Sequence, residues 1–400
     1  MNIFHRYVVR EHCAPFFFAF SVILFILIIK LMLKLMDILI SKDIGILVIG
    51  KLLVYNLAWM LALVVPMSVL VASLMAFGRM GASGEITAMK SAGISMYRIV
   101  SPVLLIAVFL TIVMIWFNNV ILPEANYRAS VLNTAITLKR PELSIKNRDS
   151  QFITDLPQIT LRVDRFDYRT NIMHGITLFK QDRTDYDTII VAENGEFKTY
   201  PSGDRLALIL RNGEIHRANN TRNQYLRNRF DTFTQLIKVD FNLNTDQKKL
   251  KNDRTMTSAE MLKNISNIRK MIAEFQLKRD TLPANLINRD AEIERYNFLI
   301  NNYLLDINEY RVEIHKKNSI PFAAIVFVLI GSSLGILVKR SGASIGIGLS
   351  IGFFTLYYLF LIAGESAGDK MYLDPWFAMW LPNFVFGAVG VMLFIYANRR

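Results

Sequence analysis

Two lysines and one aspartate share a face of the first apolar segment. Lys30, Lys34 and Asp37 follow each other at spacings of four and three residues, which places them on one side of a helix. Charged side chains inside a membrane usually serve a function, and lysines there attract anions. The pattern predicts a site for an anionic head group, with Asp37 beside it. Alternatively, the lysines extend to the membrane surface and Asp37 pairs with one of them.

The loop at residues 78–98 is a second candidate site. It is short, has glycines at both ends, and contains an amphipathic segment that begins near Ser83. An apolar stripe flanked by charge is typical of a surface that docks into a groove of a partner. A plain connector between two helices is the alternative. The candidate contact residues are Arg79, Glu85, Ile86, Met89 and Lys90.

Closely spaced glycines open the fifth apolar segment. Gly342/Gly346 and Gly348/Gly352 are small-xxx-small pairs, which let two helices approach closely. They predict either ordinary packing within the chain or a contact that slides and separates.

The sequence lacks enzymatic signatures. Residues 45–51 match the spacing of a phosphate-binding loop, but Leu52 stands where a Ser or Thr hydroxyl must meet Mg²⁺. The single cysteine, Cys13, excludes a disulfide framework, and the five histidines have no metal-ligand spacing. We therefore expect a protein that is not an enzyme, with no catalytic residues, metal site, cofactor or nucleic-acid partner.

The distribution of charge divides the chain into three blocks. The 400 residues are 52% hydrophobic and carry a net charge of +13. Of the 79 charged residues, 58 lie between Pro123 and Ser319, and the two flanks together hold only 21. This split indicates two membrane blocks around a polar insert.

Six stretches are long and apolar enough to cross a bilayer, which takes about 20 residues. They are Ala14–Met36, Leu52–Phe77, Ile99–Leu122, Ser319–Val338, Ala343–Ile362 and Trp376–Ala397. Lys and Arg concentrate at one set of ends, which predicts that both termini are cytoplasmic and that the insert lies outside. These basic residues are Arg6, Arg10, Arg79, Lys90, Arg98, Lys339, Arg340, Arg399 and Arg400.

The insert has a β half and a helical half. Alternation at Ile159, Leu161 and Val163, with hairpin-type turns at Asn194-Gly195 and Asn212-Gly213, predicts an antiparallel sandwich, jelly roll or similarly curved sheet. From Thr257 a capping-box start leads into apolar residues at spacings of three and four. This half is either a helical hairpin packed on itself or an arm that docks a partner.

The expected fold is therefore an α-helical integral membrane protein with three plus three transmembrane helices around a β domain and a helical hairpin. The expected domains are residues 1–122 (N-terminal membrane block), 123–254 (β domain), 255–318 (helical segment) and 319–400 (C-terminal membrane block).

These features together resemble the LptF/LptG family, the paired permease subunits of the lipopolysaccharide exporter. The resemblance covers almost the whole chain. The segments that carry it are Arg6-Tyr7, Lys34 with Asp37, Gly84–Gly93, Asn119–Pro123, Lys316–Pro321, and Ala363–Glu365 through Asp374-Pro375.

The resemblance implies a bacterial inner-membrane heterodimer of two paralogous permeases on a dimeric cytoplasmic ATPase. It further implies a periplasmic β-jellyroll that continues into a jellyroll bridge protein similar to LptC. Lipopolysaccharide would enter between the first helix of one subunit and the fifth of the other. Lys30 and Lys34 then match residues that meet lipid phosphates, Glu85 falls in the coupling helix, and Gly342–Gly352 border the lateral gate.

Two other functions stay open from the sequence. The chain could be a permease for another envelope lipid or lipoprotein, or a membrane sensor or scaffold that transports nothing. The cytoplasmic loops are too short for a signalling output domain, which weighs against a sensor.

Overall fold

The structure is a computed structural model with two compact units. One unit holds residues 1–32, 54–127 and 251–400, and the other holds residues 33–53 and 128–250. The residues described are 3–40, 46–139, 150–153, 159–167, 170, 172–181, 186–199, 205–219, 224–238, 251–283, 289–338 and 343–399.

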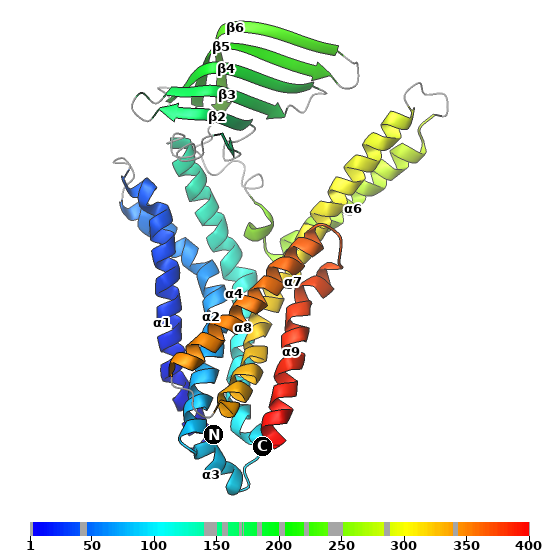
Figure 1. The fold of residues 1–400 in the computed structure, drawn as a ribbon. Coiled ribbons are helices and arrows are strands. Elements are labelled where there is room, and N and C mark those ends of the chain that lie inside the picture. Colours follow the sequence, from blue (N-terminus) through cyan, green and yellow to red (C-terminus); the bar gives the residue numbers. More distant parts are fainter. Residues whose placement is uncertain are drawn as a thin grey trace. The chain divides into compact units, whose positions relative to one another are not determined.

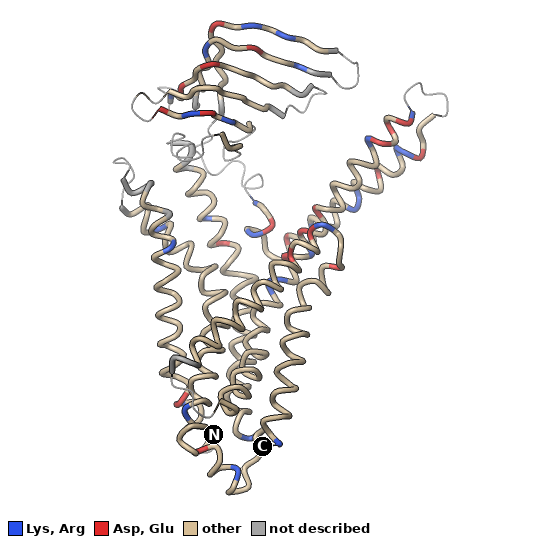
Figure 2. Tube along the Cα trace, in the orientation of Figure 1, with Lys and Arg blue, Asp and Glu red and all other residues tan. Residues whose placement is uncertain are grey.

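Six of the described helices are long and apolar enough to cross a membrane, and Figure 1 shows them as long coils. They are α1 (Ile3–Ile40), α2 (Ile46–Ala82), α4 (Met96–Lys139), α7 (Arg289–Leu337), α8 (Ala343–Asp369) and α9 (Pro375–Arg399). Each has a long stretch that is almost uncharged in Figure 2, and in α7 this stretch follows Lys317. This confirms the prediction of six apolar helices of membrane-spanning length, as in a helical membrane protein.

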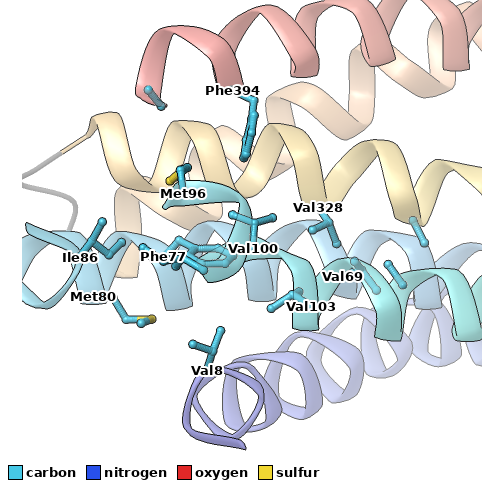
Figure 3. Packing of buried hydrophobic residues seen from close by; sticks show 14 residues of the cluster. Val8, Val69, Phe77, Met80, Ile86, Met96, Val100, Val103, Val328 and Phe394 are labelled. Atoms are coloured by element: carbon cyan, nitrogen blue, oxygen red, sulfur yellow. The ribbon is translucent and has the colours of Figure 1, made fainter. Parts of the chain in front are cut away.

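Helix α7 lies at the centre of the helical unit. One apolar core joins it to α1, α2, α4 and α9 through residues such as Val8, Phe77 and Val328, whose side chains converge in Figure 3. A second core joins α7 to α2, α8 and α9 around Phe327 and Tyr357. In contrast, only 11% of the apolar window of α1 is buried, so most of that helix is left for lipid or a partner.

Two glycines bring α7 directly against α2. A Cβ atom at Gly331 would lie 2.6 Å from the Ser73 Cβ, and one at Gly335 would lie 2.9 Å from the Gly78 amide nitrogen. Gly331 and Gly335 form a small-xxx-small pair in the fourth span, and here the motif makes a tight helix contact.

We expect Gly331→Ala to lower the thermal unfolding midpoint of the purified protein, because the new methyl group meets α2 and overpacking costs about 1–3 kcal/mol. Gly352→Ala on α8 is the matched control, since a Cβ there has no atom within 4 Å and alanine favours a helix over glycine by roughly 0.5–1 kcal/mol. Equal midpoints for the two variants would contradict this packing.

The second unit contains one antiparallel sheet of six strands. These are β1 (Phe152–Ile153), β2 (Ile159–Asp167), β3 (Ile172–Gln181), β4 (Tyr186–Thr199), β5 (Arg205–Asn219) and β6 (Gln224–Lys238). Each strand pairs with its neighbours in the chain, in the order β1 to β6. One face holds the core, and Ile159, Leu161 and Val163 alternate into it as predicted. The inserted antiparallel β domain is thereby confirmed.

One detail of the predicted β domain is wrong. The Asn194-Gly195 and Asn212-Gly213 pairs are not hairpin turns, because they lie within the long strands β4 and β5. Asn212 does have a left-handed φ of 52°, the conformation that favours asparagine in turns, but here it occurs where the pairing skips a position within the sheet. The described strands form a simple meander, and the jelly-roll form of the domain stays a prediction.

The helical half of the insert is a hairpin of α6 (Ser258–Asp280) and the first part of α7. The predicted capping box is present, with Thr257 Oγ1 accepting from the Glu260 amide and Glu260 Oε2 accepting from the Thr257 amide. The Lys251 ammonium beside Glu260 holds the pKa of that carboxyl below its usual range. This contribution to helix stability is therefore present at neutral pH and is lost as the pH falls through the lowered pKa.

The hairpin packs on itself through Ile265, Ile272, Ile300 and Ile307, and the Phe275 and Tyr303 rings stack between the helices. Of the two predictions for this segment, the self-packed hairpin is confirmed. Helix α7 then continues without interruption into the fourth span, for 49 residues in all. At 1.5 Å per residue this is about 74 Å of continuous helix, so one helix contributes to both the hairpin and the fourth span.

Candidate functional site

A short helix, α3 (Glu85–Ser91), occupies the loop between α2 and α4. Glycines allow the turns around it, since Gly84 and Gly93 have φ values of 78° and 83°, a region open to glycine without strain. Glu85 ties α3 to the first span: its carboxylate accepts hydrogen bonds from the Tyr7 hydroxyl at 2.7 Å and the Ser83 hydroxyl at 2.9 Å.

The predicted contact residues of this loop mostly face the protein's own interior. Ile86 is 3% exposed and belongs to the core in Figure 3, and Met89 packs against that core. Lys90 Nζ donates to the Ala397 carbonyl oxygen at 3.1 Å, and Arg79 pairs with Glu11. The apolar stripe therefore holds α3 in place, and Ile86 is not available to a partner. The spacing of apolar residues predicted the stripe, but it did not show whether the stripe packs on the protein's own core or on a partner.

The outward face of α3 and its flanking turns, residues 80–92, consists of small side chains. The exposed residues in this stretch are Ala82, Ser83, Thr87, Ala88, Ser91 and Ala92. Small side chains let the backbone of an approaching partner come close, as they do where helices pack tightly. This face, defined by these six residues, is called the small-residue face below.

Lys30 is exposed on α1. It lies 20 residues after Arg10, or about 30 Å along the helix axis, which is about the thickness of a hydrocarbon core. Lys34 and Asp37 follow on the same helix, and their side chains lie outside the described residues.

Helix α8 has an open face at two of the four predicted glycines. A Cβ atom at Gly348 or Gly352 would have nothing within 4 Å, whereas one at Gly346 would touch Met75 on α2 at 3.5 Å. Large apolar side chains such as Ile351, Leu356 and Leu359 are more than half exposed beside them. Gly342 lies outside the described residues. The chain itself therefore does not use the Gly348 and Gly352 positions for packing.

A polar cluster, called the polar collar here, was missed as a site by sequence reasoning. It lies 22 residues along α4 from Met96, about 33 Å, so α3 and the collar lie at opposite ends of the apolar stretch of that helix. Its members are Asn118 and Asn119 of α4, Glu313, Lys316, Lys317 and Asn318 of α7, and Glu365 of α8.

Within the collar, Lys316 Nζ contacts Glu313 at 2.5 Å and Glu365 at 2.9 Å. Lys317 is 3% exposed and donates to the Met256 carbonyl oxygen just before α6. Arg254 reaches Glu365 at 3.5 Å. Three segments quoted for the family resemblance, around Asn119, Lys316 and Glu365, thus converge. The signal available in the sequence was that all three segments carry the family resemblance. The sequence did not show that these segments touch.

The collar also supplies a hydrogen-bond donor to a backbone carbonyl that Pro321 leaves without one in α7. A proline inside a helix leaves the carbonyl four residues earlier without its usual donor. Here that carbonyl belongs to Lys317, and it accepts from Asn118 Nδ2 at 3.1 Å. Thr111 donates to the Pro321 carbonyl oxygen at 3.1 Å. Asn118 and Thr111 thereby join α4 to α7 where the hairpin continues into the span.

No group of three His, Cys, Asp or Glu side chains able to hold a metal occurs among the described residues. The described candidate sites are an anchored short helix, the exposed Lys30 on α1, an open face on α8 and the polar collar.

Comparison with known proteins agrees with this arrangement. The family model described as "Lipopolysaccharide export system permease LptF/LptG" matches residues 6–396, which is nearly the whole chain. No curated protein matches the chain. Because the match includes the six apolar helices and the inserted sheet alike, the chain belongs to the LptF/LptG family of lipopolysaccharide export permeases.

Proposed function

We propose that the chain is one permease subunit of an ATP-driven transporter that extracts lipopolysaccharide from the outer leaflet of the inner membrane. The observation that carries the proposal is the family match over residues 6–396. The lipid would then pass through the inserted β domain to a periplasmic bridge. The exposed Lys30 supports this role, since with Arg10 at the opposite boundary it would stand at the depth of lipid phosphates.

The orientation proposed is with both termini and α3 in the cytoplasm. The beginning of α1, the end of α9 and α3 lie at the same end of the helical unit in Figure 1. Basic residues such as Arg79, Lys90 and Arg98 occur at that end, as expected for cytoplasmic loops. The polar collar and Lys30 then face the periplasm.

Energy for transport would come from a separate cytoplasmic ATPase dimer, since the sequence has no nucleotide-binding motif. Each acyl methylene moved out of lipid into water costs about 0.8 kcal/mol, so extraction needs coupled ATP hydrolysis and a sheltered path. We assign the ATPase to the small-residue face. Tyr7 and Glu85 link that face to α1, the helix that carries Lys30.

Two further partners belong to the proposal. A paralogous permease would complete a heterodimer against the open face of α8, where Gly348 and Gly352 permit close approach. A periplasmic bridge protein would extend the β domain. Strand β6 supports this, because it is the last strand of the described sheet, it is 15 residues long and its side chains are mostly exposed. An open strand edge can pair with a strand of another chain.

Co-purification from the native membrane tests the proposal. We expect the tagged chain to bring with it a paralogue, a nucleotide-binding ATPase and lipopolysaccharide. Recovery with a different envelope lipid or a lipoprotein would assign it to that substrate. Recovery without any ATPase would contradict the transporter role.

A further inference from the structure

A cavity of about 210 Å³ lies between α1, α2 and α4. It is lined by residues of α1 between Val9 and Phe17, of α2 between Val69 and Ser73, and of α4 between Val103 and Leu110. The lining is almost entirely apolar. Cys13, Phe17 and Ile106, at its border, are exposed side chains. The cavity therefore opens sideways, toward the lipid that surrounds a membrane helix bundle.

Two polar atoms in this lining have no partner among the described residues. They are His12 Nε2 and Ser73 Oγ. His12 is 7% exposed and Ser73 is 1% exposed. Leaving a buried polar atom without a hydrogen bond costs about 1–3 kcal/mol, so such atoms usually indicate a water or a ligand.

The hydrogen bond at His12 Nδ1 determines whether Nε2 of the same ring donates or accepts. His12 Nδ1 lies 2.7 Å from the Val8 carbonyl oxygen, which only accepts, so Nδ1 carries the proton. Burial among apolar side chains favours the neutral ring, and Phe77 packs edge-on against it at 4.6 Å between centroids. Nε2 is therefore a hydrogen-bond acceptor that needs a donor.

The Ser73 hydroxyl further restricts which ligand group can fill the cavity. A serine hydroxyl both donates and accepts, so Ser73 can donate to an oxygen that itself donates to His12. A hydroxyl group on the ligand meets both demands, whereas a carbonyl, ether or plain hydrocarbon cannot donate to Nε2. The apolar walls require the rest of the ligand to be aliphatic.

We propose that this cavity binds a membrane amphiphile with an aliphatic chain and one hydroxyl group, held by His12 and Ser73. The cavity is larger than the engineered cavity of about 150 Å³ that accommodates benzene, so one water would leave most of it empty. An occupant would contact three helices at once and stabilise the position of α1. The site does not depend on the exporter role, because it rests only on the cavity and its two polar atoms.

The test is photolabelling of the purified chain in nanodiscs with a diazirine derivative of 1-decanol, followed by peptide mapping. We expect labels in residues 9–17 of α1 and 103–110 of α4. Unlabelled 1-decanol should compete at least about 5-fold more effectively than decane, the effect of roughly one net hydrogen bond. This comparison uses the unaltered chain, so it holds even if variants fold poorly.

Two variants and a matched control assign the polar contacts. His12→Phe and Ser73→Ala should each lower labelling about 5-fold. Ser68→Ala should not, because Ser68 lies on the same helix with its hydroxyl already bonded to the Val64 carbonyl oxygen at 2.7 Å. The sole cysteine gives an independent readout, since 1-decanol should slow alkylation of Cys13. Equal competition by decane, unchanged labelling of both variants, or no label at the cavity (a site that holds water only) would overturn the proposal.

Discussion

Replacement of Lys30 and Lys34 with glutamate is expected to abolish lipopolysaccharide export while the subunit still assembles with its ATPase. At about 4 Å, a lysine and a phosphate attract by roughly 4 kcal/mol at the intermediate dielectric of a protein surface, and a carboxylate repels by a similar amount. Reversing the charge at both positions should therefore lower the affinity for an anionic head group by several orders of magnitude. The measurement is lipopolysaccharide reaching the outer membrane in cells whose only copy carries both changes.

Lys51→Glu is the matched control for these lysines. Lys51 is also exposed, near the start of α2, and under the proposed orientation it lies on the same side of the membrane. It should leave export unchanged, and arginine at positions 30 and 34 should preserve it. If the double glutamate variant exports normally, the lysines only extend to the membrane surface, which is the alternative considered from the sequence.

Glu85→Arg is expected to reduce export at least about tenfold while ATP hydrolysis continues, because the change breaks both hydrogen bonds that join α3 to α1 and to Ser83. A loss of about 1.4 kcal/mol already corresponds to that factor, and two hydrogen bonds to a charged group contribute about 1.5–3 kcal/mol each. ATPase activity and lipopolysaccharide release are measured together in proteoliposomes.

Tyr7→Phe separates the two ways in which Glu85 could act. It keeps the ring but removes one hydrogen bond to the Glu85 carboxylate. If Glu85 acts by positioning α3, Tyr7→Phe shows a weaker form of the same uncoupling. If Glu85 contacts the ATPase directly, Tyr7→Phe behaves as the parent protein. Full coupling in the Glu85→Arg variant would contradict both roles.

Features that depend on local sequence were predictable here. Six stretches of about 20 apolar residues indicate six spans whatever their neighbours, and the capping box at Thr257 needs only residues three apart. The alternation of apolar residues at Ile159, Leu161 and Val163 likewise predicts the strand that contains them. The family could be identified because its motifs are distributed over nearly the whole chain.

Features that depend on tertiary packing were not predictable. The stripe at Ile86 is amphipathic in either orientation, and only the core around Phe77 shows that it packs inward. Asn212 prefers a left-handed conformation in a turn or in a bend within a strand, so the residue pair alone does not separate them. Small-xxx-small pairs occur in the fourth and fifth spans alike, and the close approach to α2 at Gly331 distinguishes them.

The polar collar is another feature that the sequence could not predict. Lys316 and Glu365 are 49 residues apart, and Asn118 and Lys317 are 199 apart. A charged side chain near the end of an apolar span most often extends to water, and nothing local distinguishes that outcome from a buried pair. The structure brings these residues together because α7 continues from the hairpin into the membrane, and because Pro321 frees a backbone carbonyl that Asn118 can bond.

The central claim is tested most directly by ATP-dependent release of lipopolysaccharide. Proteoliposomes should contain this chain with its co-purified paralogue and ATPase, together with a soluble acceptor for the lipid. We expect ATP to drive lipopolysaccharide to the acceptor, a complex lacking this chain not to release it, and the double glutamate variant at positions 30 and 34 to hydrolyse ATP without release. Release that proceeds equally without this chain would show that the chain is not part of the exporter.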